Sequence, residues 1–250
     1  MLETILLLIA GFGGGLVTGF FGGSVVLFFV TILVIFGNYH PYLAIGIGLT
    51  VEIFTSSMAF YVYHKNKRID LMPAIPLVIA AFGGVFLGSF FSFDVSAKTL
   101  SILAGIGICL ASIRFFKSKT FTFDKKLKNG TMYSILWGFV TGIIIGFLGG
   151  SGGIAMLVAL TMFLGYRIHK AIGTSVLIMI FIASFGAISH YIYMPFSFTA
   201  VLIGACGGIL GAAVSSKIAN ILSEKTLNSI IGVALLILGG VLALRSFGIV

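Results

Sequence analysis

Long hydrophobic stretches dominate this chain, and few charged residues interrupt them. Charge-poor apolar runs occupy residues 4–36, 53–63, 71–93, 99–113, 131–166, 171–193, 197–216 and 226–244. About 20 apolar residues cross the roughly 30 Å core of a bilayer as a helix, and most of these runs are long enough. The runs are rich in glycine and lack the period-two alternation of a membrane barrel. The pattern therefore predicts an all-α polytopic membrane protein.

A glycine-rich sequence motif occurs twice, 127 residues apart. Its first copy covers residues 11–24 and its second covers residues 138–151. The register continues, because residues 44–46 and 171–173 both read Ala-Ile-Gly. The chain is therefore predicted to be an internal duplication. Residues 1–116 form the first membrane repeat, 117–130 a basic cytoplasmic linker and 131–250 the second repeat, with about four membrane helical elements in each repeat.

The first element of each repeat is too long for one ordinary crossing. Runs 4–36 and 131–166 would each reach about 50 Å as straight helices, and each has Gly-Gly-Ser near its middle. Each run is either one long tilted span or two half-helices folded into a re-entrant hairpin. The hairpin places the basic residues of 65–68, the linker and 167–170 on one side, as the positive-inside rule requires.

The choice between these topologies matters for mechanism. With hairpins, each repeat has an odd number of crossings, and the two repeats are inverted relative to each other. The alternative is eight plain spans with parallel halves. Inverted repeats allow a central site to open to either side in turn, which is alternating access.

Composition narrows the functional classes. Hydrophobic residues make up 59% and charged residues 8% of the chain, whereas soluble domains have about 25% charged residues. The net charge of +9 lies largely in the loops and linker, which favours cytoplasmic loops over a nucleic-acid partner. The sequence lacks His-Glu-x-x-His and metal-ligand cysteine spacing, so it predicts no enzyme, no cofactor and no metal site.

The contiguous glycine clusters are the candidate binding sites. A helix that starts after such a break has free N–H groups at membrane depth, and these favour an anion. The spaced glycines 11, 15, 19 and 138, 142, 146 instead match the small-xxx-small pattern of helix packing. Hydroxyls one turn into the run after residue 167 are further candidate donors, unless they bond to their own backbone. The candidate substrate-binding residues are Gly22, Gly23, Ser24, Gly149, Gly150, Ser151, Gly152, Gly153, Thr174 and Ser175.

Two ionisable residues are candidates for proton coupling. Glu52 is the only acidic residue deep within an apolar stretch, once run 53–63 is extended back to Pro41. Intramembrane carboxylates are costly, so Glu52 is a functional candidate, with a structural hydrogen bond as the alternative. Its counterpart in the second repeat is Met179. His190 lies near the end of its run and is either a proton relay or an interfacial residue.

Several motifs occur in a characteristic order. They are Arg-Ile-Asp at 68–70, Gly-Phe-Leu-Gly-Gly-Ser-Gly-Gly at 146–153, His-Lys-Ala-Ile-Gly-Thr-Ser at 169–175, and glycine-rich runs near Gly83 and Gly207. In order and spacing the whole chain resembles the sulfite exporter TauE/SafE family. The resemblance implies a multi-pass transporter in a prokaryotic inner membrane, which exports sulfite, a sulfonate or a related organic anion.

The sequence thus predicts a carrier for a small anion, with a site between the two repeats and a coupling proton or ion. An anion channel of the same architecture and a membrane assembly protein without transport are the alternatives. Substrate identity, direction, coupling ion and oligomeric state stay open.

Overall fold

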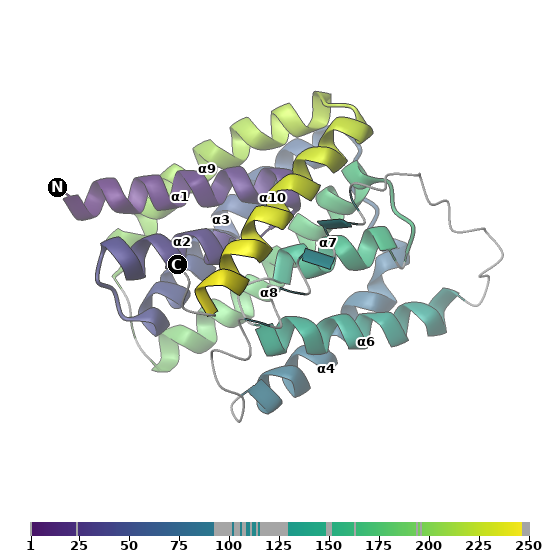
Figure 1. Ribbon diagram of the computed structural model, residues 1–250, viewed down its shortest axis with the longest axis horizontal. Helices are drawn as coiled ribbons and strands as arrows, with labels where there is room; N and C mark the ends of the chain where they lie inside the picture. The colour runs from purple at the N-terminus through teal and green to yellow at the C-terminus, as the bar shows by residue number, and fades with distance from the viewer. Residues whose placement is uncertain are drawn as a thin grey trace. The chain divides into compact units, whose positions relative to one another are not determined.

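A computed structural model of the chain describes residues 2–23, 25–92, 130–148, 152–162, 164–193, 195 and 197–246, with a few residues of 102–115. Within these residues the structure is helical and contains no strand, as predicted. The elements are α1 (Leu2–Phe21), α2 (Val25–Phe36), α3 (Pro41–Lys65), the 3-10 turn η1 (Met72–Ala74), α4 (Ile75–Ser92), α6 (Gly130–Leu148), α7 (Gly152–Met162), α8 (Ile168–Tyr193), α9 (Phe198–Ile221) and α10 (Glu224–Ser246) (Figure 1).

Several helices have the length and surface of membrane spans. Among the described residues, α1, α3, α8 and α9 are long and apolar enough to cross a bilayer. Large apolar side chains also point outward, and Phe86, Phe185 and Leu210 are 76%, 68% and 62% exposed. A soluble protein avoids such broad apolar surfaces, whereas lipid contact favours them.

The helices form two compact units. The first contains Met1–Asp70, Gly150–Leu157 and His169–Ile221, and the second contains Leu71–Gly149, Val158–Ile168 and Leu222–Val250. Each unit therefore combines segments from both predicted repeats. The repeat boundaries at 1–116, 117–130 and 131–250 stay predictions, and residues 117–129 of the linker lie outside the described residues.

In the first unit, α1 packs against α9 through glycines (Figure 1). A methyl group added to Gly11 would lie 2.0 Å from the carbonyl oxygen of Gly204. One added to Gly15 would lie 2.2 Å from the carbonyl oxygen of Gly208. Two helix backbones approach this closely only where neither carries a side chain at the contact.

In the second unit, α6 packs against α4 in the same way (Figure 1). A methyl group on Gly138 would lie 2.2 Å from the Leu77 carbonyl oxygen, and one on Gly142 would lie 2.1 Å from the Ala81 carbonyl oxygen. Each of these four residues is 127 positions from its counterpart in the α1–α9 contact. The predicted packing role of the spaced glycines is confirmed at these positions. One helix pair is thus built twice, each time from one helix of each repeat.

The break predicted in run 4–36 is confirmed. α1 ends at Phe21 and α2 begins at Val25, and Gly22 and Gly23 between them have φ angles of 86° and 114°. Glycine adopts this left-handed region at little cost, whereas a residue with a Cβ would be strained. The amides of Gly22 and Gly23 both donate to the carbonyl of Thr18, at 2.9 and 3.3 Å, and close the end of α1.

After the break, α2 returns along α1. Phe28 of α2 lies against Gly13, and Val25 lies against Gly14. At the other end, the Tyr39 hydroxyl donates to Glu3, beside a cavity of about 600 Å³ between the start of α1 and the end of α2. Run 4–36 is therefore a hairpin that starts and ends at the same side, not one long span. Its arms are unequal, because α1 has 20 residues and α2 has 12, so α1 is longer than the predicted half-helix.

Candidate functional site

The glycine break between α1 and α2 lies against the start of α7. Gly153 is the second residue of α7, and a methyl group on it would lie 2.3 Å from the carbonyl oxygen of Gly23. The hydroxyl of Ser175, in the second turn of α8, donates to the carbonyl of Gly22 at 2.7 Å and lies 3.3 Å from that of Gly153. Ser175 is fully buried and joins both predicted clusters.

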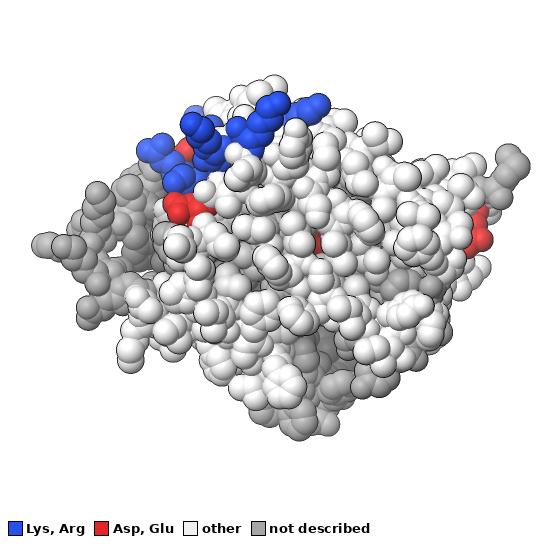
Figure 2. Space-filling view, turned by 180° about the vertical axis from the view of Figure 1, so that it is seen from behind, with Lys and Arg blue, Asp and Glu red and all other residues white. Residues whose placement is uncertain are grey.

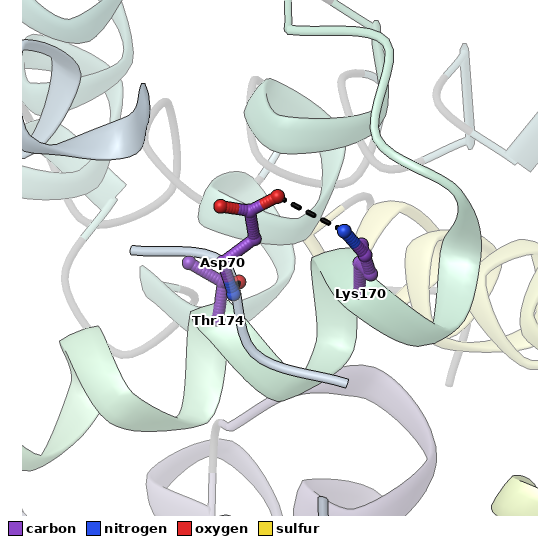
Figure 3. Close-up of polar contacts among 3 residues, drawn as sticks. All are labelled: Asp70, Lys170 and Thr174. Carbon is purple, nitrogen blue, oxygen red and sulfur yellow. Dashed lines mark hydrogen bonds and ion pairs between the residues drawn. The ribbon is translucent and has the colours of Figure 1, made fainter. Parts of the chain in front are cut away.

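A short extended strap, residues 68–70, crosses the beginning of α8. The backbone N–H of Asp70 donates to the Thr174 hydroxyl oxygen at 3.1 Å, and its carboxylate pairs with the Lys170 ammonium at 3.0 Å. Figure 3 shows Lys170 and Thr174 directed from one face of α8 toward Asp70. A methyl group on Gly173 would lie 2.3 Å from the carbonyl oxygen of Arg68, so the strap lies directly on α8.

The strap belongs to the basic end of the first unit. Lys65 ends α3, Lys67 and Arg68 follow it, and the Asp70 contact brings Lys170 beside them. The Nε2 atom of His169 lies 3.0 Å from the carbonyl oxygen of Ala219, so the end of α9 is held beside the start of α8. Figure 2 shows Lys and Arg side chains gathered along one edge of the molecule, beside acidic side chains. The predicted common side of residues 65–68 and 167–170 agrees with these contacts.

Glu52 lies midway along α3 and is fully buried. Its carboxylate accepts hydrogen bonds from the backbone N–H of Val25, the first residue of α2, and from the Ser56 hydroxyl at 2.7 Å. The structural hydrogen bond that the sequence left open is therefore present. The bond joins Glu52 to the helix start that was predicted to hold an anion.

Some functional contacts were not anticipated from the sequence. Ser56 is four residues after Glu52, a spacing that brings side chains together on a helix, so this signal was available. Asp70 belongs to the Arg-Ile-Asp motif at 68–70. Its partners Lys170 and Thr174 are about 100 residues away, and no local sequence pattern reveals them.

Other predicted residues are not placed. Ser24, Gly149, Gly150, Ser151 and the side chain of His190 lie outside the described residues, and Gly152 is the first residue of α7. Among the residues that the structure does describe, no group of three or more His, Cys, Asp and Glu is arranged to hold a metal ion.

Comparison with known proteins places this chain in a family. The model of the family described as sulfite exporter TauE/SafE matches residues 7–242. The chain belongs to the TauE/SafE family. It is 28% identical to probable membrane transporter protein YunE of Bacillus subtilis (strain 168), over 92% of this chain and 90% of the relative. It is 37% identical to probable membrane transporter protein YdhB of the same organism, over 43% of this chain and 46% of the relative. No solved structure matches it.

This TauE/SafE protein is thus a membrane transporter, as its family and its apolar helices together show. Its site offers backbone N–H groups, hydroxyls and one carboxylate, which are groups that bind oxyanions and exchange protons. According to the sequence, Lys and Arg are absent from α1, α2 and α7 and occur in α3 and α8 only at the helix ends.

Proposed function

We propose that this protein moves a small anion across the prokaryotic cell membrane, in the export direction, by alternating access of a site between the two repeats. The transported anion is sulfite, a sulfonate or a related organic anion. The observation that carries the proposal is the convergence of Gly22, Gly23, Gly153 and Ser175 in the interior of an apolar helical unit. At this convergence the first amide of α2 already binds a carboxylate.

The proposed site holds its anion without a fixed cation. The first amides of a helix lack partners within the helix, and the helix dipole adds a partial positive charge there. A hydrogen bond to a charged group contributes about 1.5–3 kcal/mol, so three amides at the start of a helix would supply roughly 4–9 kcal/mol. That range corresponds to dissociation constants from about 1 mM to below 1 μM, which suits a carrier that must also release its substrate.

The basic end of the unit supports the approach of an anion from that side. Lys65, Lys67, Arg68 and Lys170 create a positive potential beside α8, which raises the local concentration of anions. Thr174 and Ser175 follow Lys170 along α8 and lead from this surface to the glycine break. The choice of a sulfur-containing anion rests on the family that the chain belongs to.

The test is transport by the purified protein in proteoliposomes. Sulfite, methanesulfonate, ethanesulfonate and acetate are each tested for saturable counterflow, with and without an imposed pH gradient. We expect counterflow of at least one sulfur-containing anion. Flux that does not saturate and shows no counterflow would favour a channel, and absence of flux for every anion would contradict transport.

Two serines of α8 provide a matched pair for the site. Ser175 bonds to the glycine break, whereas the hydroxyl of Ser184 donates to the Ile180 carbonyl of its own helix at 2.7 Å. Ser175→Ala removes the hydrogen bond that holds the Gly22 carbonyl, so the glycine break is less well positioned and anion affinity should weaken about tenfold, or about 1.4 kcal/mol. Ser184→Ala should leave affinity unchanged. Equal affinity in both variants would remove Ser175 from the site.

A further inference from the structure

The carboxylate of Glu52 occupies the place at which the proposed function puts the transported anion. The Val25 amide binds one of its oxygens, and the Ser56 hydroxyl binds the other at 2.7 Å. A methyl group on Gly23 would lie 3.3 Å from the same oxygen that Ser56 binds, so the carboxylate also borders the glycine break. A fully buried carboxyl group of the protein itself therefore occupies the Val25 donor at the start of α2.

Among the described side chains of the packed helices, most other titratable groups have partners elsewhere or lie at helix ends, and Tyr61 of α3 and Cys206 of α9 are exposed. α2 and α7 carry none, and Met179 is the residue of α8 beside the glycine break near Glu52. The remaining groups with known partners are Glu3 of α1 with Tyr39, Tyr63 of α3 with the Gly19 carbonyl, His169 of α8 with the Ala219 carbonyl, and Lys170 of α8 with Asp70. His64 and Lys65 end α3, and Lys217 lies near the end of α9. Among the described side chains, the carboxyl group beside the glycine break is thus that of Glu52.

We propose that Glu52 competes with the transported anion for the start of α2, and that the anion is co-transported with one proton. This inference rests on the proposed function. An ionised Glu52 and a substrate anion cannot use the same amide. Two negative charges side by side also repel each other strongly in a region of low dielectric constant. The anion therefore binds only when Glu52 is neutral or displaced.

The exchange balances in charge and protons. Glu52 takes one proton from water on the side to which the site is open, becomes a neutral carboxylic acid and releases the Val25 amide to the anion. On the opposite side the anion leaves, the proton returns to water, and the carboxylate binds Val25 again. One proton accompanies each anion, so a monovalent sulfonate crosses without net charge.

This coupling sets the driving forces. An exported anion takes a proton out with it, so export runs down the concentration gradient of the anion. An acidic exterior instead drives uptake through the same protein. The sign follows from competition, because a group that must be protonated before the anion binds makes the two bind together.

The test uses the full chain in proteoliposomes, with methanesulfonate and ethanesulfonate as probes because their charge is constant over the pH range of the assay. In the wild type, affinity should fall about tenfold per pH unit on the alkaline side, as linkage to one proton requires. In Glu52→Gln, affinity should not depend on pH, labelled anion should still exchange, and a pH gradient should no longer drive accumulation.

A second pair of variants covers the case in which Glu52→Gln does not fold. Ser56→Ala removes a hydrogen bond to the carboxylate, whereas Ser57→Ala removes one from an exposed hydroxyl to the Ile53 carbonyl. A hydrogen bond to the carboxylate favours its charged form, so the pH profile of Ser56→Ala should move about one unit toward alkaline pH. The profile of Ser57→Ala should match the wild type.

The outcomes separate the two proposals. If the wild type exchanges none of the anions, the proposed function fails, and this inference fails with it. If the wild type exchanges them and folded Glu52→Gln keeps the same pH dependence, this inference alone fails. A Ser56→Ala profile identical to the wild type also overturns it. A vesicle-trapped pH dye should report one proton for each sulfonate that enters with the wild type and none with Glu52→Gln.

Discussion

Gly153 lies so close to Gly23 that a methyl group on it would be 2.3 Å from the Gly23 carbonyl oxygen. Gly23 belongs to the break in the first repeat, and Gly153 is the second residue of α7, which follows the second glycine cluster in the sequence. Gly23 and Gly153 approach this closely because neither residue carries a side chain. Any ligand of the amides at the start of α2 is therefore bordered by backbone of both repeats.

Gly153→Ala should damage folding as well as binding. Its methyl group would meet backbone, which cannot move aside as a side chain end does, so we expect a loss of about 1–3 kcal/mol in stability. Gly48→Ala in α3 is the control, because its methyl group would meet atoms at 3.6 Å or farther, an ordinary contact. Thermal unfolding in detergent and anion affinity of the folded fraction are measured for both. A wild-type melting temperature in Gly153→Ala would contradict the close approach.

The two glycine contacts between helices should respond alike to substitution. Gly15→Ala pushes α1 from α9, and Gly142→Ala pushes α6 from α4, with methyl-to-oxygen distances of 2.2 and 2.1 Å. Each should lower stability by about 1–3 kcal/mol. Gly83→Ala in α4 meets nothing within 4 Å and should stabilise its helix by about 0.5–1 kcal/mol. Melting temperatures of the three variants are compared with that of the wild type. A wild-type melting temperature in Gly142→Ala would refute the packing of α6 on α4.

The helices and the break at Gly22-Gly23 were predictable because they depend on local pattern. Apolar length sets a helix, and adjacent glycines allow the positive φ angles that end one. The spaced glycines also predicted a face for helix packing. They did not say that α1 would pack on α9 of the other repeat, because a glycine stripe identifies a contact surface and not its partner.

The site was predicted in outline only. Ser175 was expected beside the glycine clusters and lies there, yet its hydroxyl donates to the Gly22 carbonyl. Glu52 was expected to be functional or structural, and its contact with Val25 depends on the return of α2 along α1. Sequence spacing cannot show this contact, because 27 residues and a reversal of the chain separate the partners. Binding of an anion by any of these residues stays a prediction.

Tyr39 provides a test by pH of the hairpin end. Burial, and then the hydrogen bond and charge of Glu3, raise the pKa of Tyr39 to about 12. In the unfolded chain a phenol ionises near 10, so the folded state favours the protonated form. This contribution is complete below pH 10 and is lost as pH rises through 12. The stability advantage of the wild type over Tyr39→Phe should therefore shrink between about pH 10 and 12.

Thermal unfolding at pH 9 and pH 11 measures this change. Tyr61→Phe serves as the control, because Tyr61 is 60% exposed on α3, and it should follow the wild type at both pH values. A difference between the wild type and Tyr39→Phe that does not change with pH would mean that the phenol proton plays no part in holding α1 to the loop before α3.

Sidedness remains the most direct test of the inverted repeats. The hairpin of α1 and α2 and the contact of residues 65–70 with α8 both fit a common cytoplasmic side for residues 65–68 and 167–170. Cysteines introduced at Lys67, Lys119 and Lys170, with Cys109 and Cys206 replaced by Ser, should react alike with an impermeant thiol reagent. Opposite labelling of Lys119 and Lys170 would contradict the inverted arrangement.

The ion pair between Asp70 and Lys170 should regulate anion capture more than stability. Its side chains are 36% and 45% exposed, and such pairs stabilise a fold by at most about 1 kcal/mol. Asp70→Asn leaves the Lys170 ammonium without its carboxylate, so the half-saturating anion concentration should fall severalfold at low ionic strength. Lys170→Gln should raise it, and Lys217→Gln, at the same end of the unit on α9, should change it little. Initial transport rates are measured in 20 and 300 mM salt. The lower half-saturating anion concentration of Asp70→Asn should be seen at low salt and should weaken at high salt, because salt screens the charge of Lys170. An Asp70→Asn protein that melts like the wild type and shows the wild-type half-saturation at low salt would mean that the pair does not compete with the anion.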